Sequence, residues 1–149
     1  MKKIMFVCHG NICRSPMAEF VFKDLLQKAG RENEFSVDSS ATSREEIGNG
    51  IYPPTKRKLR EKGIQFSEHY ARQITKSEYD DWDLFVCMDS ANVRNLMRIF
   101  GEDKKSKVKK LLDYTSRGGD VADPWYTGNF EITYIDVLEG CIELLKTLY

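Results

Sequence analysis

The sequence has no long hydrophobic run and no excess of charge of either sign. Its 23 lysines and arginines balance 23 aspartates and glutamates, so the overall charge gives no reason to bind nucleic acid or an anionic membrane. No segment approaches the ~20 apolar residues of a membrane-spanning helix. The apolar run that follows Lys2 and Lys3 is too short for a signal peptide. We therefore expect neither nucleic acid nor membrane as a partner, and we expect any anion site to be local.

Cysteine is also scarce. The four cysteines in 149 residues are too few for the disulfide framework of a small secreted protein, which favours a cytoplasmic location. There is no internal repeat and no low-complexity tract, and the Gly-Lys-Ser or Gly-Lys-Thr of a nucleotide-binding P-loop is missing. A hydrophobic content of 41% at this length is enough for one core. We therefore expect residues 1–149 to form a single domain.

Strand-like and helix-like patterns alternate along the chain. Short apolar runs predict strands at residues 3–7, 35–39 and 84–88, with a further candidate at 108–112. Apolar residues at helical spacing predict helices at 16–29, 54–62, 90–100 and from 130 onward. This alternation favours an α/β fold with three layers, a Rossmann-like parallel sheet between helices, in which ligands bind beyond the carboxyl ends of the strands.

Two of the helix predictions concern particular residues. Ser15 is the predicted N-cap of the first helix, with Pro16 at its first position. The last helix is predicted to face the sheet with five apolar residues, which are Ile132, Ile135, Leu138, Ile142 and Leu145. Residues 44–54 and 116–129 are predicted to be the two longest loops, and loops at the rim of a sheet commonly carry function.

The turn between the first strand and the first helix has the composition of a phosphate site. A strand-to-helix turn directs backbone N–H groups and a helix N-terminus at one point. Gly10 and Asn11 tolerate the left-handed backbone that such a cradle requires, and Arg14 adds a fork that grips two phosphate oxygens. The predicted phosphate-binding loop follows Cys8 and consists of His9, Gly10, Asn11, Ile12, Cys13, Arg14 and Ser15.

Cys8 is the predicted nucleophile of this loop. A helix N-terminus and a neighbouring arginine both favour the thiolate, which can attack phosphorus and form a phosphocysteine intermediate. The Ser15 hydroxyl is expected to turn toward the Cys8 sulfur and ease its departure in the second step. A cysteine at the end of a strand is otherwise usually a small buried hydrophobe. The strand before it and the Ser-Pro after it favour the catalytic interpretation.

Residues 8–19, which read CHGNICRSPMAE, together with Asp123-Pro124-Trp125, resemble the low-molecular-weight protein tyrosine phosphatases. The resemblance runs from Met1 to Tyr149. It implies a four-stranded parallel sheet of the phosphotyrosine phosphatase I type and activity on phosphotyrosine-containing proteins or peptides. It also implies inorganic phosphate as a product, with no metal or organic cofactor. Asp123 would be the general acid, and the chemistry needs one because the leaving phenolate must be protonated.

The resemblance assigns further roles. Trp125 and Tyr126 would line the substrate cleft. A supporting hydrogen-bond network would consist of Asn11, Ser15, Ser39 and His69. Cys13 would form a reversible disulfide with Cys8 when the enzyme is oxidised. Glu45 stands in the cleft loop where several relatives place an aromatic residue, which leaves the peptide preference open.

Two related activities share this loop and remain alternatives. Ile12 occupies the position at which protein arginine phosphatases carry a threonine, which favours phosphotyrosine over phosphoarginine. Arsenate reductases use additional cysteines in a mobile segment, whereas Cys87 and Cys141 here fall in predicted core positions. A module that binds phosphoryl groups without turnover would need neither Cys8 nor Asp123. Whether the chain is a monomer or a weak dimer is left open.

Overall fold

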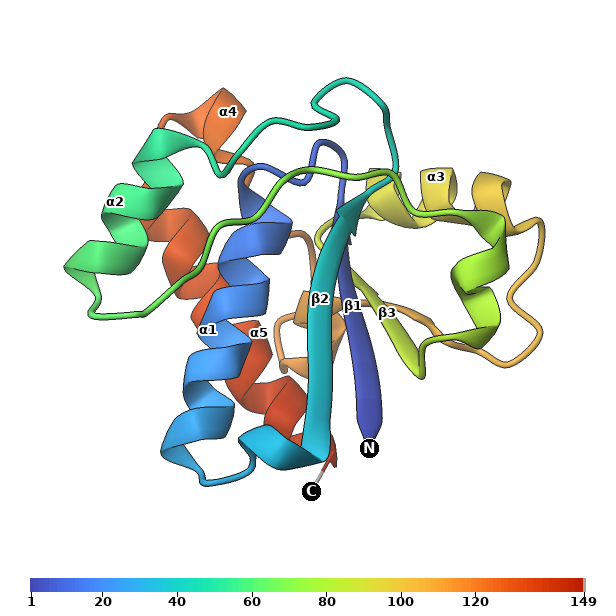
Figure 1. Ribbon diagram of the computed structural model, residues 1–149, viewed down its shortest axis with the longest axis horizontal. Helices are drawn as coiled ribbons and strands as arrows, with labels where there is room; N and C mark the ends of the chain where they lie inside the picture. Colours follow the sequence, from blue (N-terminus) through green and yellow to red (C-terminus); the bar gives the residue numbers. More distant parts are fainter. Residues whose placement is uncertain (149) are drawn as a thin grey trace.

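The computed structural model describes residues 1–148 and has a four-stranded parallel sheet at its centre (Figure 1). The strands are β1 (Lys2–Cys8), β2 (Phe35–Ala41), β3 (Leu84–Cys87) and β4 (Val108–Lys110), in the spatial order β2-β1-β3-β4. Every neighbouring pair is parallel. The predicted α/β fold and its four parallel strands are therefore confirmed, although β4 is shorter than predicted because a 3-10 turn takes over after Lys110.

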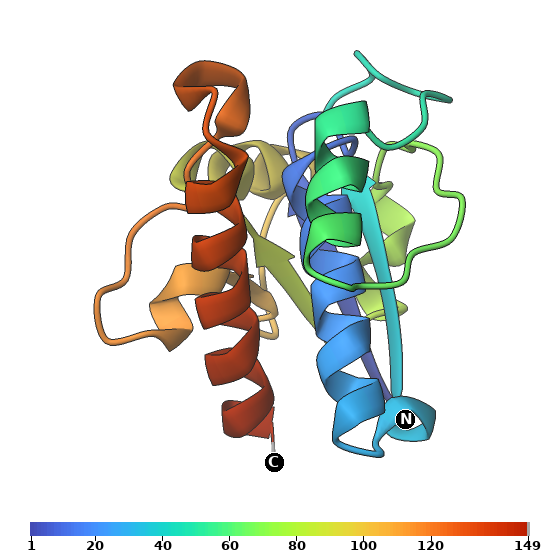
Figure 2. The ribbon, with the colours of Figure 1, turned by 90° about the vertical axis from the view of Figure 1, so that its left-hand side faces the viewer.

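Helices cover both faces of this sheet. The α-helices are α1 (Arg14–Lys28), α2 (Pro53–Glu61), α3 (Ser90–Phe100), α4 (Pro124–Thr127) and α5 (Phe130–Leu148). Three short 3-10 helices are η1 (Glu32–Glu34), η2 (Lys76–Asp80) and η3 (Leu111–Tyr114). α1 and α5 lie side by side on one face with α2 beside them (Figure 2), and α3 and η2 cover the other.

The central strand β1 is apolar on both faces because it is buried on both. Its alternate side chains Ile4 and Phe6 belong to the larger core with α1 and α5, whereas Met5 and Val7 pack toward α3 and η2. All four are fully buried. A continuous apolar run of this kind is typical of a parallel sheet between two helical layers, which is why the sequence pattern predicted this strand.

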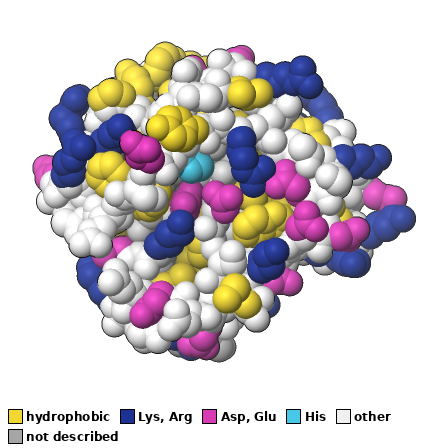
Figure 3. Space-filling model, in the orientation of Figure 1, with side chains coloured by type: hydrophobic (Ala, Val, Ile, Leu, Met, Phe, Trp, Pro, Cys, Tyr) yellow, Lys and Arg dark blue, Asp and Glu magenta, His cyan; other side chains and the backbone are white. Residues whose placement is uncertain are grey.

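The loops that follow the carboxyl ends of β1, β2 and β3 gather at one end of the molecule, and both chain termini lie at the other (Figure 1). α4, absent from the sequence prediction, interrupts the loop of residues 116–129 at this same end. Acidic and basic side chains are interspersed over the face in Figure 3. Among residues 1–148, no helix combines the length and apolarity needed to cross a bilayer.

The prediction that Ser15 caps the first helix is wrong. α1 begins two residues earlier than predicted, at Arg14, and its N-cap is Cys13, which makes no side-chain cap hydrogen bond. The first helical backbone bond runs from the Met17 N–H to the Cys13 carbonyl at 3.1 Å. Ser15 is thereby the second helical residue, and its hydroxyl is free to point back into the loop. Pro16 is tolerated at the third position, because first-turn N–H groups have no intrahelical partner.

The predicted inner face of the last helix is also wrong in its first two turns, and beyond them only Leu145 of the predicted residues is buried, whereas Leu138 and Ile142 are half-buried. Ile132 and Ile135 are 45% and 51% exposed, and the buried residues in their place are Thr133 and Asp136. The physical reason lies in the next turn, where Gly140 lets α5 approach Leu111 of η3 closely. This contact sets the rotation of the helix and turns the two isoleucines toward solvent.

The contact at Gly140 gives a prediction for stability. Alanine normally stabilises a helix interior relative to glycine by ~1 kcal/mol. A Cβ on Gly140 would lie 2.4 Å from Cγ of Leu111, so Gly140→Ala should instead destabilise the protein by about 1–3 kcal/mol through overpacking. Urea unfolding would measure this. The double variant Gly140→Ala/Leu111→Ala should lose less stability than the sum of its parts, and strict additivity would contradict the steric explanation.

Candidate active site

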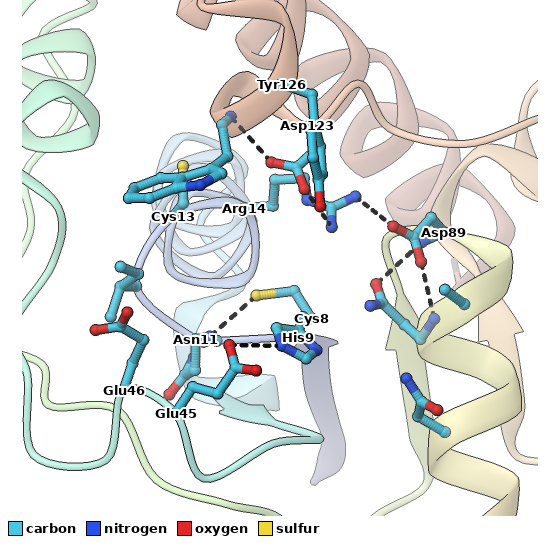
Figure 4. A pocket seen from close by; sticks show the side chains of 16 residues that line it. Cys8, His9, Asn11, Cys13, Arg14, Glu45, Glu46, Asp89, Asp123 and Tyr126 are labelled. Atoms are coloured by element: carbon cyan, nitrogen blue, oxygen red, sulfur yellow. Dashed lines mark hydrogen bonds and ion pairs between the residues drawn. The ribbon is translucent and has the colours of Figure 1, made fainter.

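A pocket of about 440 Å³ opens at the carboxyl end of β1 (Figure 4). The phosphate-binding loop forms its floor, and residues from three later segments form its walls. These lining residues are Cys8, His9, Gly10, Asn11, Ile12, Cys13, Arg14, Glu45, Glu46, Asp89, Ala91, Asn92, Asn95, Asp123, Trp125 and Tyr126. Predicted site residues separated by more than 100 positions in the sequence therefore meet in one cavity.

The backbone of the loop turns at Asn11. Its φ of 59° lies in the left-handed region, which asparagine tolerates better than most residues. Gly10 was expected to share this conformation, but it has no positive φ. A different constraint acts there, because a Cβ on Gly10 would stand 3.3 Å from Cγ of Glu46. Glycine at this position makes room for the wall of the pocket.

The Cys8 sulfur is held from two sides. The Ser15 hydroxyl oxygen lies 2.9 Å from Sγ, and the Asn11 backbone N–H donates to Sγ over 3.2 Å. Cys8 is only 3% exposed. Donors around a sulfur stabilise its anion more than its neutral thiol, so this arrangement suits a nucleophilic thiolate.

The predicted network of Asn11, Ser15, Ser39 and His69 is assembled in the structure. The Asn11 side-chain amide donates to the Ser15 hydroxyl at 2.8 Å and to the Ser39 hydroxyl at 3.0 Å. Because the Ser15 oxygen already accepts from Asn11, its own proton is available to the Cys8 sulfur. The hydrogen bonds therefore run in one direction, from the Asn11 amide to the Ser15 hydroxyl and from that hydroxyl to the Cys8 sulfur.

Glu19 is a member of this network that the sequence analysis missed. It is a buried carboxylate, 3% exposed, and it accepts from the Ser39 hydroxyl at 2.7 Å and from Lys23 Nζ at 2.6 Å. Its position four residues after Ser15, on an otherwise apolar stretch of helix, was the available signal. The carboxylate fixes the Ser39 proton, which leaves the Ser39 oxygen to accept from Asn11.

His69 connects a distant loop to the same network. Its Nε2 lies 2.8 Å from Oδ1 of Asn11, so the ring donates its Nε2 proton to that oxygen. Burial lowers the pKa of His69 from its ordinary value, against the smaller opposing effects of Glu19 and Asp38. A neutral His69 with its proton on Nε2 therefore satisfies Asn11.

Arg14 lies buried between two carboxylates. Its NH1 donates to Asp89 at 2.8 Å and to the Val121 carbonyl at 3.1 Å, and its NH2 lies 3.4 Å from Asp123 (Figure 4). Burial opposes the charge, but Cys8, Asp89 and Asp123 together raise the pKa of Arg14. Asp89 was not predicted as a site residue, although it follows β3 as directly as the loop follows β1.

Asp123 and the aromatic rim come from α4. Asp123 is the N-cap of this helix and accepts from the Trp125 N–H at 3.0 Å. Trp125 and Tyr126 are 64% and 86% exposed. Tyr52, which the sequence analysis did not single out, packs against Trp125 with ring centroids 5.3 Å apart. The pocket thus has a wall of exposed rings beside a carboxylate.

The remaining predicted residues also lie at the pocket. His9 Nε2 is 2.9 Å from the Glu45 carboxylate at the rim (Figure 4), and Ile12 lines the wall. Cys13 accepts a hydrogen bond from the Thr55 hydroxyl at 3.2 Å. Burial raises the pKa of Cys13 to about 12, so its thiol stays protonated at neutral pH.

One group of side chains has the composition of a metal site. Potential ligand atoms of Glu19, Asp38 and His69 lie within 4.8 Å of one another. Positive charge is already supplied to the two carboxylates, because Lys23 pairs with Glu19 and Arg72 lies 3.5 Å from Asp38. We therefore interpret this cluster as support for the loop.

The chain is similar to known proteins over nearly its whole length. The family described as low molecular weight phosphotyrosine protein phosphatase matches residues 3–149. The protein-tyrosine-phosphatase YfkJ of Bacillus subtilis is 41% identical, covering 99% of this chain and 96% of the relative, and its crystal structure gives a TM-score of 0.95 over 94% of that chain. A Schizosaccharomyces pombe phosphatase is 38% identical over 98% and 96% of the two chains. The Streptococcus pyogenes phosphatase SP-PTP is 39% identical, covering 100% of this chain and 94% of the other, with a TM-score of 0.91.

The environment of His69 predicts how stability depends on pH. The unfolded chain takes up a proton at His69 near pH ~6.5, whereas the folded protein resists protonation because burial lowers the pKa. The unfolded state then binds more protons, so stability falls as the pH drops below ~6.5 toward the folded pKa. His69→Gln should reduce this loss between pH 7.5 and 5.5, measured as urea midpoints at each pH.

The other histidine of the chain, His9, provides the control for this experiment. His9 has a half-exposed side chain at the rim, and His9→Gln removes one imidazole without touching the network. If the urea midpoint came to depend on pH equally in both variants, or if His69→Gln left this dependence unchanged, His69 would not be the group responsible.

Proposed function

Because the chain belongs to the low-molecular-weight phosphotyrosine protein phosphatase family, we propose that it hydrolyses phosphotyrosine in proteins or peptides through a phosphocysteine on Cys8. The observation that carries the proposal is the Cys8 sulfur, held 2.9 Å from the Ser15 hydroxyl in a pocket floored by buried Arg14. A loop that only binds phosphate does not need a sulfur with two hydrogen-bonding partners.

In the first step, the Cys8 thiolate attacks phosphorus. A sulfur–phosphorus bond forms, the bond from phosphorus to the tyrosine oxygen breaks, and Asp123 gives its proton to that oxygen. Arg14 and the loop amides stabilise the charge on the equatorial oxygens. Arg14 is always charged, and Asp89 fixes its NH1 at 2.8 Å, so the guanidinium is preorganised for this role.

In the second step, water attacks the phosphocysteine. Asp123, now a carboxylate, accepts the proton of that water, the sulfur–phosphorus bond breaks, and inorganic phosphate leaves. The departing sulfur is again a thiolate. Ser15 donates to it, and the donation is sustained because the Asn11 amide occupies the Ser15 oxygen at 2.8 Å.

The substrate class follows from the walls of the pocket. The rings of Trp125 and Tyr126 beside Asp123 fit an aromatic phosphoester, and Ile12 favours phosphotyrosine over phosphoarginine. Glu45 at the rim bears on the flanking residues of the peptide. We further propose a reducing, cytoplasmic compartment, because Cys8 has to stay reduced to act as a nucleophile. Monomer or weak dimer remains a prediction.

The role of Asp123 predicts a dependence on the leaving group. Asp123→Asn should lower kcat/KM for phenyl phosphate by roughly 10²–10⁴-fold. The loss should be smaller for para-nitrophenyl phosphate, whose phenolate leaves without much help. Cys8→Ser should abolish hydrolysis of both. Steady-state kinetics at mildly acidic pH would measure these effects.

A neighbouring carboxylate serves as the control. Asp120 lies on the same loop but pairs with Lys110 at 3.0 Å, and it is not among the residues that line the pocket. The Asp120→Asn variant should therefore show the same dependence of kcat/KM on the leaving group as the parent protein. Full activity in Cys8→Ser would overturn the mechanism. Turnover of a phosphoarginine peptide or of arsenate in preference to a phosphotyrosine peptide would favour the alternative activities.

We also propose that Cys13 protects the nucleophile during oxidation. Peroxide converts Cys8 to a sulfenic acid, and Cys13 sulfur then displaces hydroxide from it, so that a disulfide and water result once the Cys13 proton is transferred. Cys13→Ser should therefore recover less activity than the parent when a thiol is added after peroxide treatment. Activity on para-nitrophenyl phosphate before and after the thiol would measure the recovery.

Cys141→Ser provides the matched comparison, because Cys141 is a fully buried cysteine on α5. It should recover like the parent protein. Equal recovery of the Cys13→Ser variant and the parent would rule out the protective disulfide.

A further inference from the structure

Ala122, the residue before Asp123, is hydrogen-bonded through both its backbone N–H and its C=O to side chains of α5. The Thr133 hydroxyl donates to the Ala122 carbonyl at 2.7 Å, and the Asp136 carboxylate accepts from the Ala122 N–H at 2.9 Å. We propose that Thr133 and Asp136 are positioning residues that set the place of Asp123 relative to Arg14. We call these two contacts the Ala122 clamp, and the inference rests on the proposed function of Asp123.

The two contacts act on different peptide groups. The Ala122 N–H belongs to the peptide shared with Val121, whose carbonyl accepts from Arg14 NH1 at 3.1 Å. The Ala122 carbonyl belongs to the peptide shared with Asp123. One contact therefore ties the chain to the arginine side of the pocket and the other orients the backbone of the acid. Together they fix the segment that separates the two groups.

The far end of the clamp is itself held in place. Asp136 also accepts from Arg117, which is bound in turn to Glu139 one helical turn later. At the start of α5, Glu131 pairs with Lys58 and Lys62 of the α2 region at 2.9 and 3.1 Å. α4 sits at this N-terminal end of α5 (Figure 2). The clamp thus connects Asp123 to a helix anchored against the rest of the molecule.

The burial of these side chains argues for a specific role. Thr133 is fully buried and Asp136 is 7% exposed. A buried hydroxyl or carboxylate destabilises a protein unless it is hydrogen-bonded, and isoleucines one residue away on the same helix are left exposed. The polar atoms face the one backbone segment that leads into the proposed acid, where they satisfy its N–H and C=O.

The experiment compares two substrates that differ in their need for a general acid. Thr133→Val keeps the shape of the side chain and removes the donor to the Ala122 carbonyl. We expect kcat/KM for phenyl phosphate to fall roughly ten- to a hundredfold, as for a catalytic group misplaced by a fraction of an ångström to one ångström, with a smaller fall for para-nitrophenyl phosphate. Thr133→Ser should restore both values, because it returns the hydroxyl.

A double-variant test separates positioning from a general effect on the fold. In an Asp123→Asn background, Thr133→Val should add no further leaving-group dependence, because the acid to be positioned is gone. Asp136→Asn, which weakens the second contact, should act in the same direction as Thr133→Val. Thr147→Val is the matched control, since Thr147 bonds the Glu143 carbonyl at the other end of α5, and it should leave both substrates unchanged.

Failure of the clamp and failure of the proposed function give different results. Suppose that Asp123→Asn shows the expected dependence on the leaving group. The clamp is then overturned if Thr133→Val lowers kcat/KM equally for both substrates or for neither. Absence of that dependence in Asp123→Asn itself overturns the proposed role of Asp123. Thermal unfolding of each variant identifies any that does not fold, and Asp136→Asn then decides in place of Thr133→Val.

Discussion

The geometry of the site depends on the side chain of Asn11. This buried residue has a left-handed backbone and uses both ends of its amide, donating to Ser15 and Ser39 and accepting from His69. An aspartate would lack the two donors, and a glycine would keep the backbone conformation but lose every side-chain contact. Asparagine is suited to both demands at once, because it tolerates the left-handed region and has a bifunctional side chain.

The direction of the proton donors follows from a buried charge at the other end of this network. Glu19 accepts only, so Ser39 must donate to it, Asn11 must donate to Ser39, and Ser15 is left to donate toward Cys8. Lys23 compensates the charge of Glu19 at 2.6 Å. A carboxylate on α1 thus determines which way a hydroxyl points at the nucleophile, without touching the sulfur.

The sequence predicted those features that depend on local patterns. Apolar periodicity and turn chemistry predict the buried strand before Cys8, the helix after it, and their meeting at the carboxyl ends of the strands. The start of α1 was misplaced by two residues, because Ser15 looks like a cap while its hydroxyl serves the loop. Glu19 and Asp89 were missed because their roles depend on partners 20 and 75 residues away. A charged residue on an apolar stretch of helix marks Glu19 locally, but it does not identify the partner.

The error in α5 is informative for a related reason. Counting apolar residues assigned Ile132 and Ile135 to the core, although Thr133 and Asp136 are buried instead. Places where a chain violates its own local pattern are often places where function imposes a demand. Here the buried polar atoms meet the backbone next to Asp123. The rotation set by the contact at Gly140 thus turns two polar side chains of α5 toward this loop, where they satisfy the N–H and C=O of Ala122.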